Sequence, residues 1–135
     1  MSKRLMKRFY QELTIALHHA GVAFWDTEVD GPGVTIYSKG RSMRYVIVVG
    51  GSKSLKKRLF YLAHEIGHAI DVDKFTDGRL VFKLRKKPSM SERKANETAC
   101  KILDALDPKL SKQFEKHYNE MHASSGRNKF KRKEF

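Results

Sequence analysis

The sequence predicts a protein of the α+β class, in which helices accompany a group of short β-strands. Apolar residues recur at helical spacing in several segments, which indicates helices with a buried face. Short runs rich in β-branched and aromatic residues are separated by glycine-containing turns, which indicates strands. The 135 residues suit one domain with its own hydrophobic core. We expect this domain to cover residues 1–122 and a basic, disordered tail to cover residues 123–135.

The expected elements follow from local residue patterns. The expected helices cover residues 3–20, 54–70, 89–106 and 108–122. The expected strands cover residues 22–25, 34–37 and 45–49. Gly21 follows the first helix at a position typical of a C-cap, and Ser52 or Ser54 can cap the second helix. Asp77 and Gly78 fit the tight turn of a β-hairpin.

The composition limits the cellular setting and the kinds of partner. Cys100 is the only cysteine, so an internal disulfide is excluded and nothing requires an oxidising compartment. No apolar run suits a secretory signal or a membrane span, so we expect a cytoplasmic protein that does not enter a membrane. The net charge of +13 predicts attraction to a polyanion such as nucleic acid, an anionic membrane surface or an acidic protein.

Basic residues form clusters that could contact the phosphates of a nucleic acid. We expect non-specific nucleic-acid binding by Lys53, Lys56, Lys57 and Arg58 and, in the tail, by Lys129, Lys131, Arg132 and Lys133. Phe130 and Phe135 lie in the same tail and could stack on the bases of a single strand. Any one cluster alone is also typical of a solvated surface. No helix suited to reading a base sequence is evident, so sequence-specific recognition is not expected.

The strongest functional pattern is the segment His64-Glu65-Ile66-Gly67-His68. The helix around it is apolar nearly all round, which predicts that it is buried. Positions 64 and 68 lie one turn and about 40° apart, so both imidazoles can bind one ion. Glu65 lies on the flank of the same arc, where a hydrolytic zinc site needs a base. The alternative is a buried helix with two hydrogen-bonded histidines and no metal, because so short a pattern also arises by chance.

A catalytic zinc ion usually takes three protein ligands, so one more is needed. Glu92 is the leading candidate, since it projects from the apolar face of the helix at 89–106. An alternative places Glu92 in a capping box that begins at Ser89, where its carboxylate would bond back to the helix start. Asp71 and Asp73 are rivals for the ligand position, although Asp71 better suits capping the helix or orienting a histidine.

Other polar residues are expected around the ligands. Asn96 lies one turn after Glu92 and is placed to hydrogen-bond a ligand. His117 and Tyr118, in the last helix, are candidates for the donor that stabilises an oxyanion, and both equally suit packing. The strand at 45–49 comes directly before the site helix, so we expect it to offer its edge to an extended peptide.

The segments at 59–68 and 92–99 together resemble the ImmA/IrrE family of zincin-like metallopeptidases. The likeness covers roughly residues 45–103 and is strongest in the two ligand-bearing helices. It implies a small antiparallel sheet packed with an active-site helix and a second ligand-bearing helix. It also implies zinc bound by His64, His68 and Glu92, with Glu65 as general base. Members commonly act in bacterial and phage cytoplasm on DNA-bound regulators.

The activity that the resemblance implies is zinc-dependent hydrolysis of a peptide bond in a protein target. Two departures from the family pattern are visible, because Thr98 replaces a usual aromatic residue and no helix-turn-helix segment is recognisable. Two other functions stay open. A nucleic-acid-binding protein could use zinc for structure alone, although Glu65 argues against this. A host-takeover factor or toxin could bind a partner with little or no proteolysis.

Overall fold

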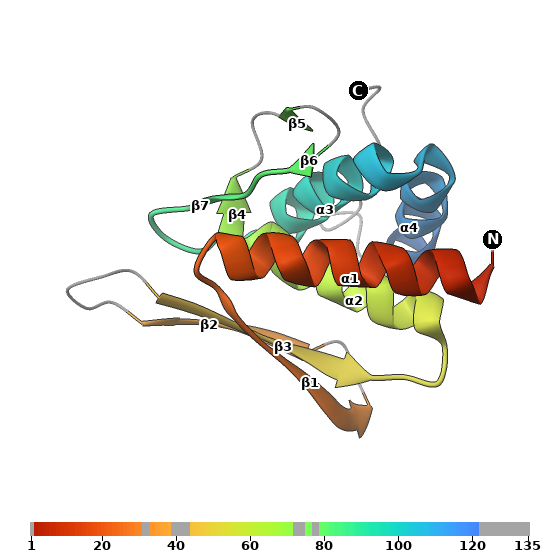
Figure 1. Ribbon diagram of the computed structural model, residues 1–135, viewed down its shortest axis with the longest axis horizontal. Coiled ribbons are helices and arrows are strands. Elements are labelled where there is room, and N and C mark those ends of the chain that lie inside the picture. The colour runs from red at the N-terminus through yellow and green to blue at the C-terminus, as the bar shows by residue number, and fades with distance from the viewer. Residues whose placement is uncertain (1, 31–32, 39–43, 72–74, 77–78, 122–135) are drawn as a thin grey trace.

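The computed structural model describes residues 2–30, 33–38, 44–71, 75–76 and 79–121 (Figure 1). It confirms the α+β class, since four helices lie together on one side of a small three-stranded sheet. Asp77 and Gly78 of the predicted hairpin turn, and the predicted tail at 123–135, lie outside the described residues. None of the described helices is both long enough and apolar enough to traverse a bilayer.

The helices lie close to their predicted positions. They are α1 (Lys3–His19), α2 (Leu55–Ala69), α3 (Glu92–Leu106) and α4 (Pro108–Met121). Ser54 caps α2, because its hydroxyl accepts a hydrogen bond from the backbone N–H of Lys57 at 3.3 Å. The cap of α3 is Ser91, whose hydroxyl accepts from the N–H of Lys94 at 3.2 Å. The capping box from Ser89 is therefore wrong, since Glu92 is the first residue of α3 rather than the third.

The main sheet contains β1 (Ala23–Asp30), β3 (Arg44–Gly51) and β2 (Gly33–Ser38), in that spatial order. β2 pairs with β3 in antiparallel fashion, but β1 pairs with β3 in parallel, so the expected antiparallel sheet is wrong for that pair. Because β1 and β2 run in opposite directions on either side of β3, one pairing has to be parallel. β3 is thus the central strand, and the expectation that residues 45–49 offer a free edge to a peptide is also wrong. The free edges of the described sheet belong to β1 and β2.

Two short ladders follow α2. β4 (Ile70–Asp71) continues directly from α2 and pairs with β7 (Lys83–Leu84). β5 (Phe75–Thr76) pairs antiparallel with β6 (Arg79–Leu80), in agreement with the predicted hairpin. After β7, the backbone N–H of Arg85 donates to the carbonyl of Ala69 at 2.9 Å. This hydrogen bond holds the segment between β7 and α3 against the C-terminal end of α2.

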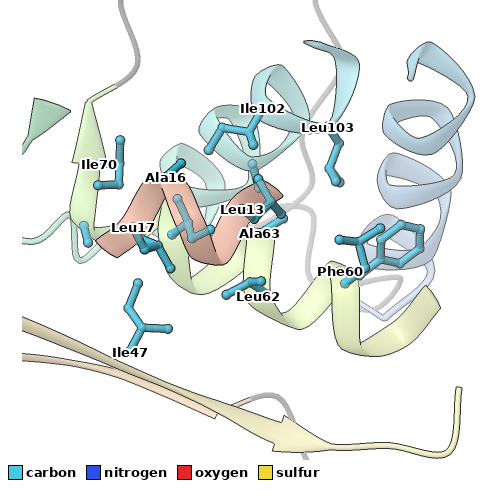
Figure 2. Close-up of a cluster of buried hydrophobic side chains, with 14 of the residues drawn as sticks. Leu13, Ala16, Leu17, Ile47, Phe60, Leu62, Ala63, Ile70, Ile102 and Leu103 are labelled. Atoms are coloured by element: carbon cyan, nitrogen blue, oxygen red, sulfur yellow. The ribbon is translucent and has the colours of Figure 1, made fainter. Parts of the chain in front are cut away.

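The hydrophobic core lies between the sheet and the helices, and α2 runs through its centre (Figure 2). Several of its fully covered side chains come from α1, α2, β3 and α3, and they are Leu13, Leu17, Ile47, Leu62, Ala63, Ile102 and Leu103. α2 packs against β3 on one side and against α3 on the other, which confirms the prediction that this apolar helix is buried. His64 and Glu65 are each only 5% exposed as a result.

α2 and α3 approach each other most closely at Gly67. A methyl group at this position would lie 2.1 Å from the backbone oxygen of Ala95 in α3. Arg85 joins the same two helices, because its guanidinium donates to the Gly67 carbonyl at 3.3 Å and to the Thr98 hydroxyl at 2.9 Å. Thr98 therefore has a polar partner where the family pattern has an aromatic ring. These contacts fix the spacing of the two helices that carry the predicted metal ligands.

The change Gly67→Ala tests this close approach. In an open helix the substitution stabilises by about 0.5–1 kcal/mol. Here the methyl group has to displace the α3 backbone, so we expect the free energy of unfolding to fall by about 1–3 kcal/mol in urea denaturation. Lys94→Ala, at an exposed position on the facing helix, is the control and should change stability by less than about 0.5 kcal/mol. A Gly67→Ala protein more stable than the wild type would contradict the close packing of α2 on α3.

Candidate metal centre

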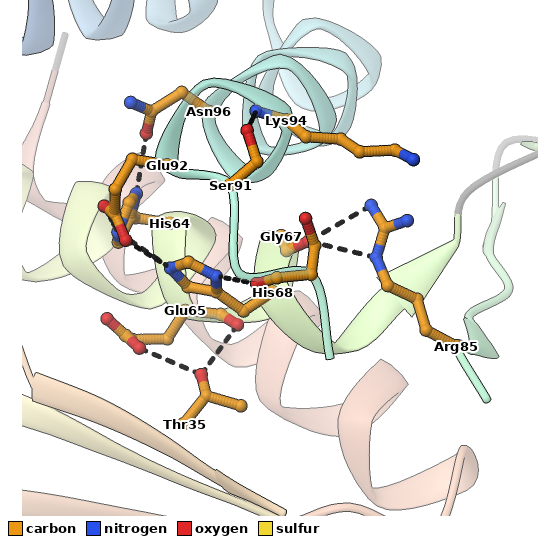
Figure 3. Close-up of polar contacts among 11 residues, drawn as sticks. Thr35, His64, Glu65, Gly67, His68, Arg85, Ser91, Glu92, Lys94 and Asn96 are labelled. Carbon is orange, nitrogen blue, oxygen red and sulfur yellow. Dashed lines mark hydrogen bonds and ion pairs between the residues drawn. The ribbon is translucent and has the colours of Figure 1, made fainter. Parts of the chain in front are cut away.

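Three side chains from two helices converge at one point (Figure 3). His64 and His68 come from α2, and Glu92 comes from the first turn of α3. The two Nε2 atoms of the histidines lie 3.2 Å apart. The carboxylate oxygens of Glu92 lie 2.9 Å from Nε2 of His64 and 3.2 Å from Nε2 of His68. One ligand atom from each residue lies within 4.8 Å of the others, so the group could hold a metal ion.

The other nitrogen of each imidazole is held by a hydrogen-bond acceptor. Nδ1 of His64 donates to Oδ1 of Asn96 at 2.6 Å, which is the role expected for Asn96. Nδ1 of His68 donates to the backbone carbonyl of Ser89 at 2.6 Å. The N–H of Ser89 in turn donates to the carbonyl of His68 at 2.9 Å, so this acceptor is itself fixed. In the neutral rings, these bonds place the proton on Nδ1 and direct both Nε2 lone pairs toward Glu92.

In the neutral rings, the converging atoms offer lone pairs and carry no hydrogen. Two Nε2 atoms and two carboxylate oxygens face one another, and such a group is repulsive unless a positive charge joins it. Burial lowers the pKa of His64, but the hydrogen bond to Glu92, the charge of Glu65 and the bond to Asn96 outweigh burial and raise that pKa overall. The site therefore attracts positive charge. A divalent cation can satisfy all three side chains at once, whereas a proton satisfies one pair.

Glu65 lies beside the ligand cluster without belonging to it. Thr35 of β2 lies with its hydroxyl 2.9 Å from Oε1 of Glu65 and 2.9 Å from the backbone oxygen of the same residue. Burial raises the pKa of the Glu65 carboxyl, although the charge of His64 and the bond from Thr35 partly offset this. A buried carboxylate with a raised pKa is suited to accepting a proton near neutral pH. Sequence patterns gave no sign of Thr35, because it lies thirty positions away on a strand.

Tyr118 of α4 reaches the cluster. Its ring stacks on the ring of His64, with centroids 5.0 Å apart and planes 15° apart. The hydroxyl is buried and has no hydrogen-bond partner among the described residues. Burial, together with the charges of Glu65 and Glu92, raises the pKa of Tyr118 far above its usual value, so the hydroxyl stays protonated. A buried hydroxyl without a partner costs free energy, which a hydrogen bond to another group would recover.

His117 and Asp71 are not among the side chains that converge as possible metal ligands. The ring of His117 packs against Phe60. Burial lowers the pKa of His117, and the positive charges of Lys57 and Lys56 lower it further. Asp71 is exposed in β4, while both Nδ1 atoms of the histidines already have other acceptors. The orienting role considered for Asp71 thus falls to Asn96 and Ser89. Asp73, the other rival ligand, lies outside the described residues.

The comparison of Glu92→Gln with Ser91→Ala separates a ligand from a helix cap. Ser91→Ala removes the cap of α3 and should cost about 1 kcal/mol of stability while zinc still binds. Glu92→Gln keeps the cap but removes a charged ligand, so zinc affinity should fall by well over tenfold. Competition titration with a zinc chelator measures the affinity, and urea denaturation measures the stability. Unchanged zinc affinity in Glu92→Gln would remove Glu92 from the ligand set.

Three comparisons with known proteins bear on the chain. No protein-family model matches it, and no match is found among curated proteins or among solved structures. The resemblance to the ImmA/IrrE family accordingly stays a prediction from the two motif-bearing segments. What can be said of the function rests on the geometry of His64, Glu65, His68, Glu92 and Tyr118.

Proposed function

We propose that the chain is a zinc-dependent metallopeptidase that hydrolyses a peptide bond in a protein target. The observation that carries the proposal is the buried carboxylate of Glu65 directly beside the cluster of His64, His68 and Glu92. A structural zinc site is usually closed by four protein ligands and needs no neighbouring base. The described cluster has three ligands, and the Glu92 side chain is 42% exposed, so one side is open to water and substrate.

The ligand set and its surroundings fit hydrolytic chemistry. Two neutral imidazoles and a carboxylate are a common set for catalytic zinc. When bound, zinc would supply Lewis acidity that polarises the scissile carbonyl and makes water easier to deprotonate. Oε1 of Glu65 is held by Thr35, so Oε2 would take the proton from the attacking water and pass it to the leaving amine. Asn96 and the Ser89 carbonyl keep the two imidazoles oriented throughout.

The arrangement around Glu65 also suits an extended substrate. β2 pairs with β3 along one edge, and its other edge is free in the described part of the sheet. Thr35 of β2 contacts Glu65, so a peptide that pairs with the free edge of β2 would run past the base. The Tyr118 hydroxyl would then donate to the oxyanion that develops on the scissile carbonyl. The basic charge of the chain favours a target that is itself bound to nucleic acid.

Glu65→Gln tests the proposed chemistry. The zinc-loaded, full-length protein is incubated with a proteome-derived peptide library, and new amino termini are counted by mass spectrometry. We expect turnover to fall by about 10²–10⁴-fold in Glu65→Gln, because the water loses its base while zinc affinity is retained. Equal numbers of new termini in both proteins, or none in either, would contradict peptidase function and favour a zinc protein that only binds nucleic acid.

Tyr118→Phe tests the donor to the oxyanion in steady-state kinetics on a peptide that the library assay identifies as a substrate. The phenyl ring keeps the stack on His64 and loses only the hydroxyl. We expect kcat to fall by about 10²–10³-fold with little change in KM, because the bond would form only as charge develops. Tyr10→Phe, which removes a tyrosine hydroxyl that contacts Asp26 on β1, is the matched control and should leave kcat unchanged. Equal kcat in Tyr118→Phe and the wild type would exclude this role.

A further inference from the structure

A groove of about 580 Å³ lies where the N-terminal turns of α1, α2 and α4 meet. Four lysines line it: Lys3 and Lys7 from α1, and Lys53 and Lys56 at the start of α2. We call it the lysine groove. The other lining residues are uncharged apart from Arg58, and no aspartate or glutamate is among them. Lys53 and Lys56 belong to the cluster predicted from the sequence, whereas the contribution of α1 becomes visible only in the folded chain.

Within the described residues, no carboxylate neutralises the positive charge of the lysine groove. None of its four lysines forms an ion pair with a described residue. The first turns of α1, α2 and α4 also contain no acidic residue, so the helix dipoles add to the positive potential. The four cations therefore repel one another in the free protein, and an anion in the groove would relieve that repulsion.

The neighbouring basic residues behave differently. Arg58 forms an ion pair with Asp26 and lies over the ring of Tyr10, so its charge is already engaged. Lys57 lines an adjacent hollow of about 900 Å³, and Lys53, Asp26 and Glu28 line that hollow too. Those carboxylates make that hollow a poor site for an anion. Of the four basic residues predicted at the start of α2, Lys53 and Lys56 line the lysine groove without an ion pair to a described residue, whereas Lys57 does not line it.

We propose that the lysine groove binds the phosphodiester backbone of a nucleic acid. Several lysines that line one concave surface suit a strand that carries one charge per phosphate, and the contacts need no base sequence. An anionic membrane fits less well, because a bilayer is flat and is held by apolar anchors beside the cations. The large exposed apolar side chains of the described chain are Ile15, Trp25, Val29, Val34, Ile36, Val81 and Met90, and none of them lines this groove.

Nucleic-acid binding at this site would place the metal centre near proteins that share the same strand. Lys56 and His64 lie on one helix, eight residues or about 12 Å apart along its axis. The groove uses neither the metal ligands nor Glu65, so binding should not require zinc. The inference therefore goes beyond the proposed peptidase activity and can fail or succeed independently of it.

The triple variant of Lys7, Lys53 and Lys56 to Gln tests the proposal in the full-length chain. These side chains are exposed, so the fold should be retained, as a thermal melt checks. Binding to labelled 20-mers of duplex DNA, single-stranded DNA and RNA is measured from 50 to 300 mM salt. We expect at least about tenfold weaker binding near 0.1 M salt, and on duplex DNA a salt slope smaller by up to ~0.9 for each lost phosphate contact. Differences in affinity among the three probes would identify the preferred kind of nucleic acid.

The matched control replaces Lys83, Lys87 and Lys94 with Gln, which removes the same charge from exposed positions outside the groove. This control should bind all three probes within about twofold of the wild type. Equal weakening by both triple variants would overturn the proposal in favour of diffuse charge. Binding of poly-glutamate or of phosphatidylserine vesicles that matches nucleic-acid binding and depends equally on the groove lysines would overturn the assignment to nucleic acid.

Discussion

The contact between the imidazoles of His64 and His68 is the constraint on which the rest of the site depends. Their Nε2 atoms lie 3.2 Å apart, and both Nδ1 atoms are engaged as donors to oxygen at 2.6 Å. Neither ring can turn away without giving up its bond to Asn96 or to Ser89. In the neutral rings the two lone pairs therefore stay face to face, and a cation shared with Glu92 removes their repulsion.

The fold converts this local constraint into a link between two helices. Gly67 lets the backbone of α3 approach α2, and Arg85 bonds to both helices on the far side of that contact. A cation held by α2 and α3 would add a third connection between them, so its binding should stabilise the packed state. Glu65 is positioned from the opposite direction by Thr35 of the sheet. The ligands and the base are thus fixed by different parts of the structure.

The site could be predicted from sequence as far as helix geometry determines it. The spacing of His64, Glu65 and His68 places the three side chains on one arc of α2. Asn96 lies one turn after Glu92, which brings its side chain within hydrogen-bond distance of His64. Strand order could not be predicted, because the insertion of β3 between β1 and β2 depends on contacts distant in sequence. The prediction of Ser89 as the cap of α3 was wrong for a related reason, since the contact that decides the cap is also distant in sequence.

Ser89 and Ser91 both offer a hydroxyl three residues before a polar side chain, so local sequence does not distinguish them as caps. What distinguishes them is the pair of hydrogen bonds between Ser89 and His68, which holds Ser89 outside the helix.

The central claim is that a zinc ion sits among His64, His68 and Glu92, and X-ray absorption spectroscopy of the zinc-loaded protein tests it most directly. We expect a nitrogen and oxygen shell at about 2.0–2.1 Å with scattering from two imidazoles. A sulfur neighbour at about 2.3 Å, which only Cys100 or a methionine could supply, or a shell without imidazole would contradict it.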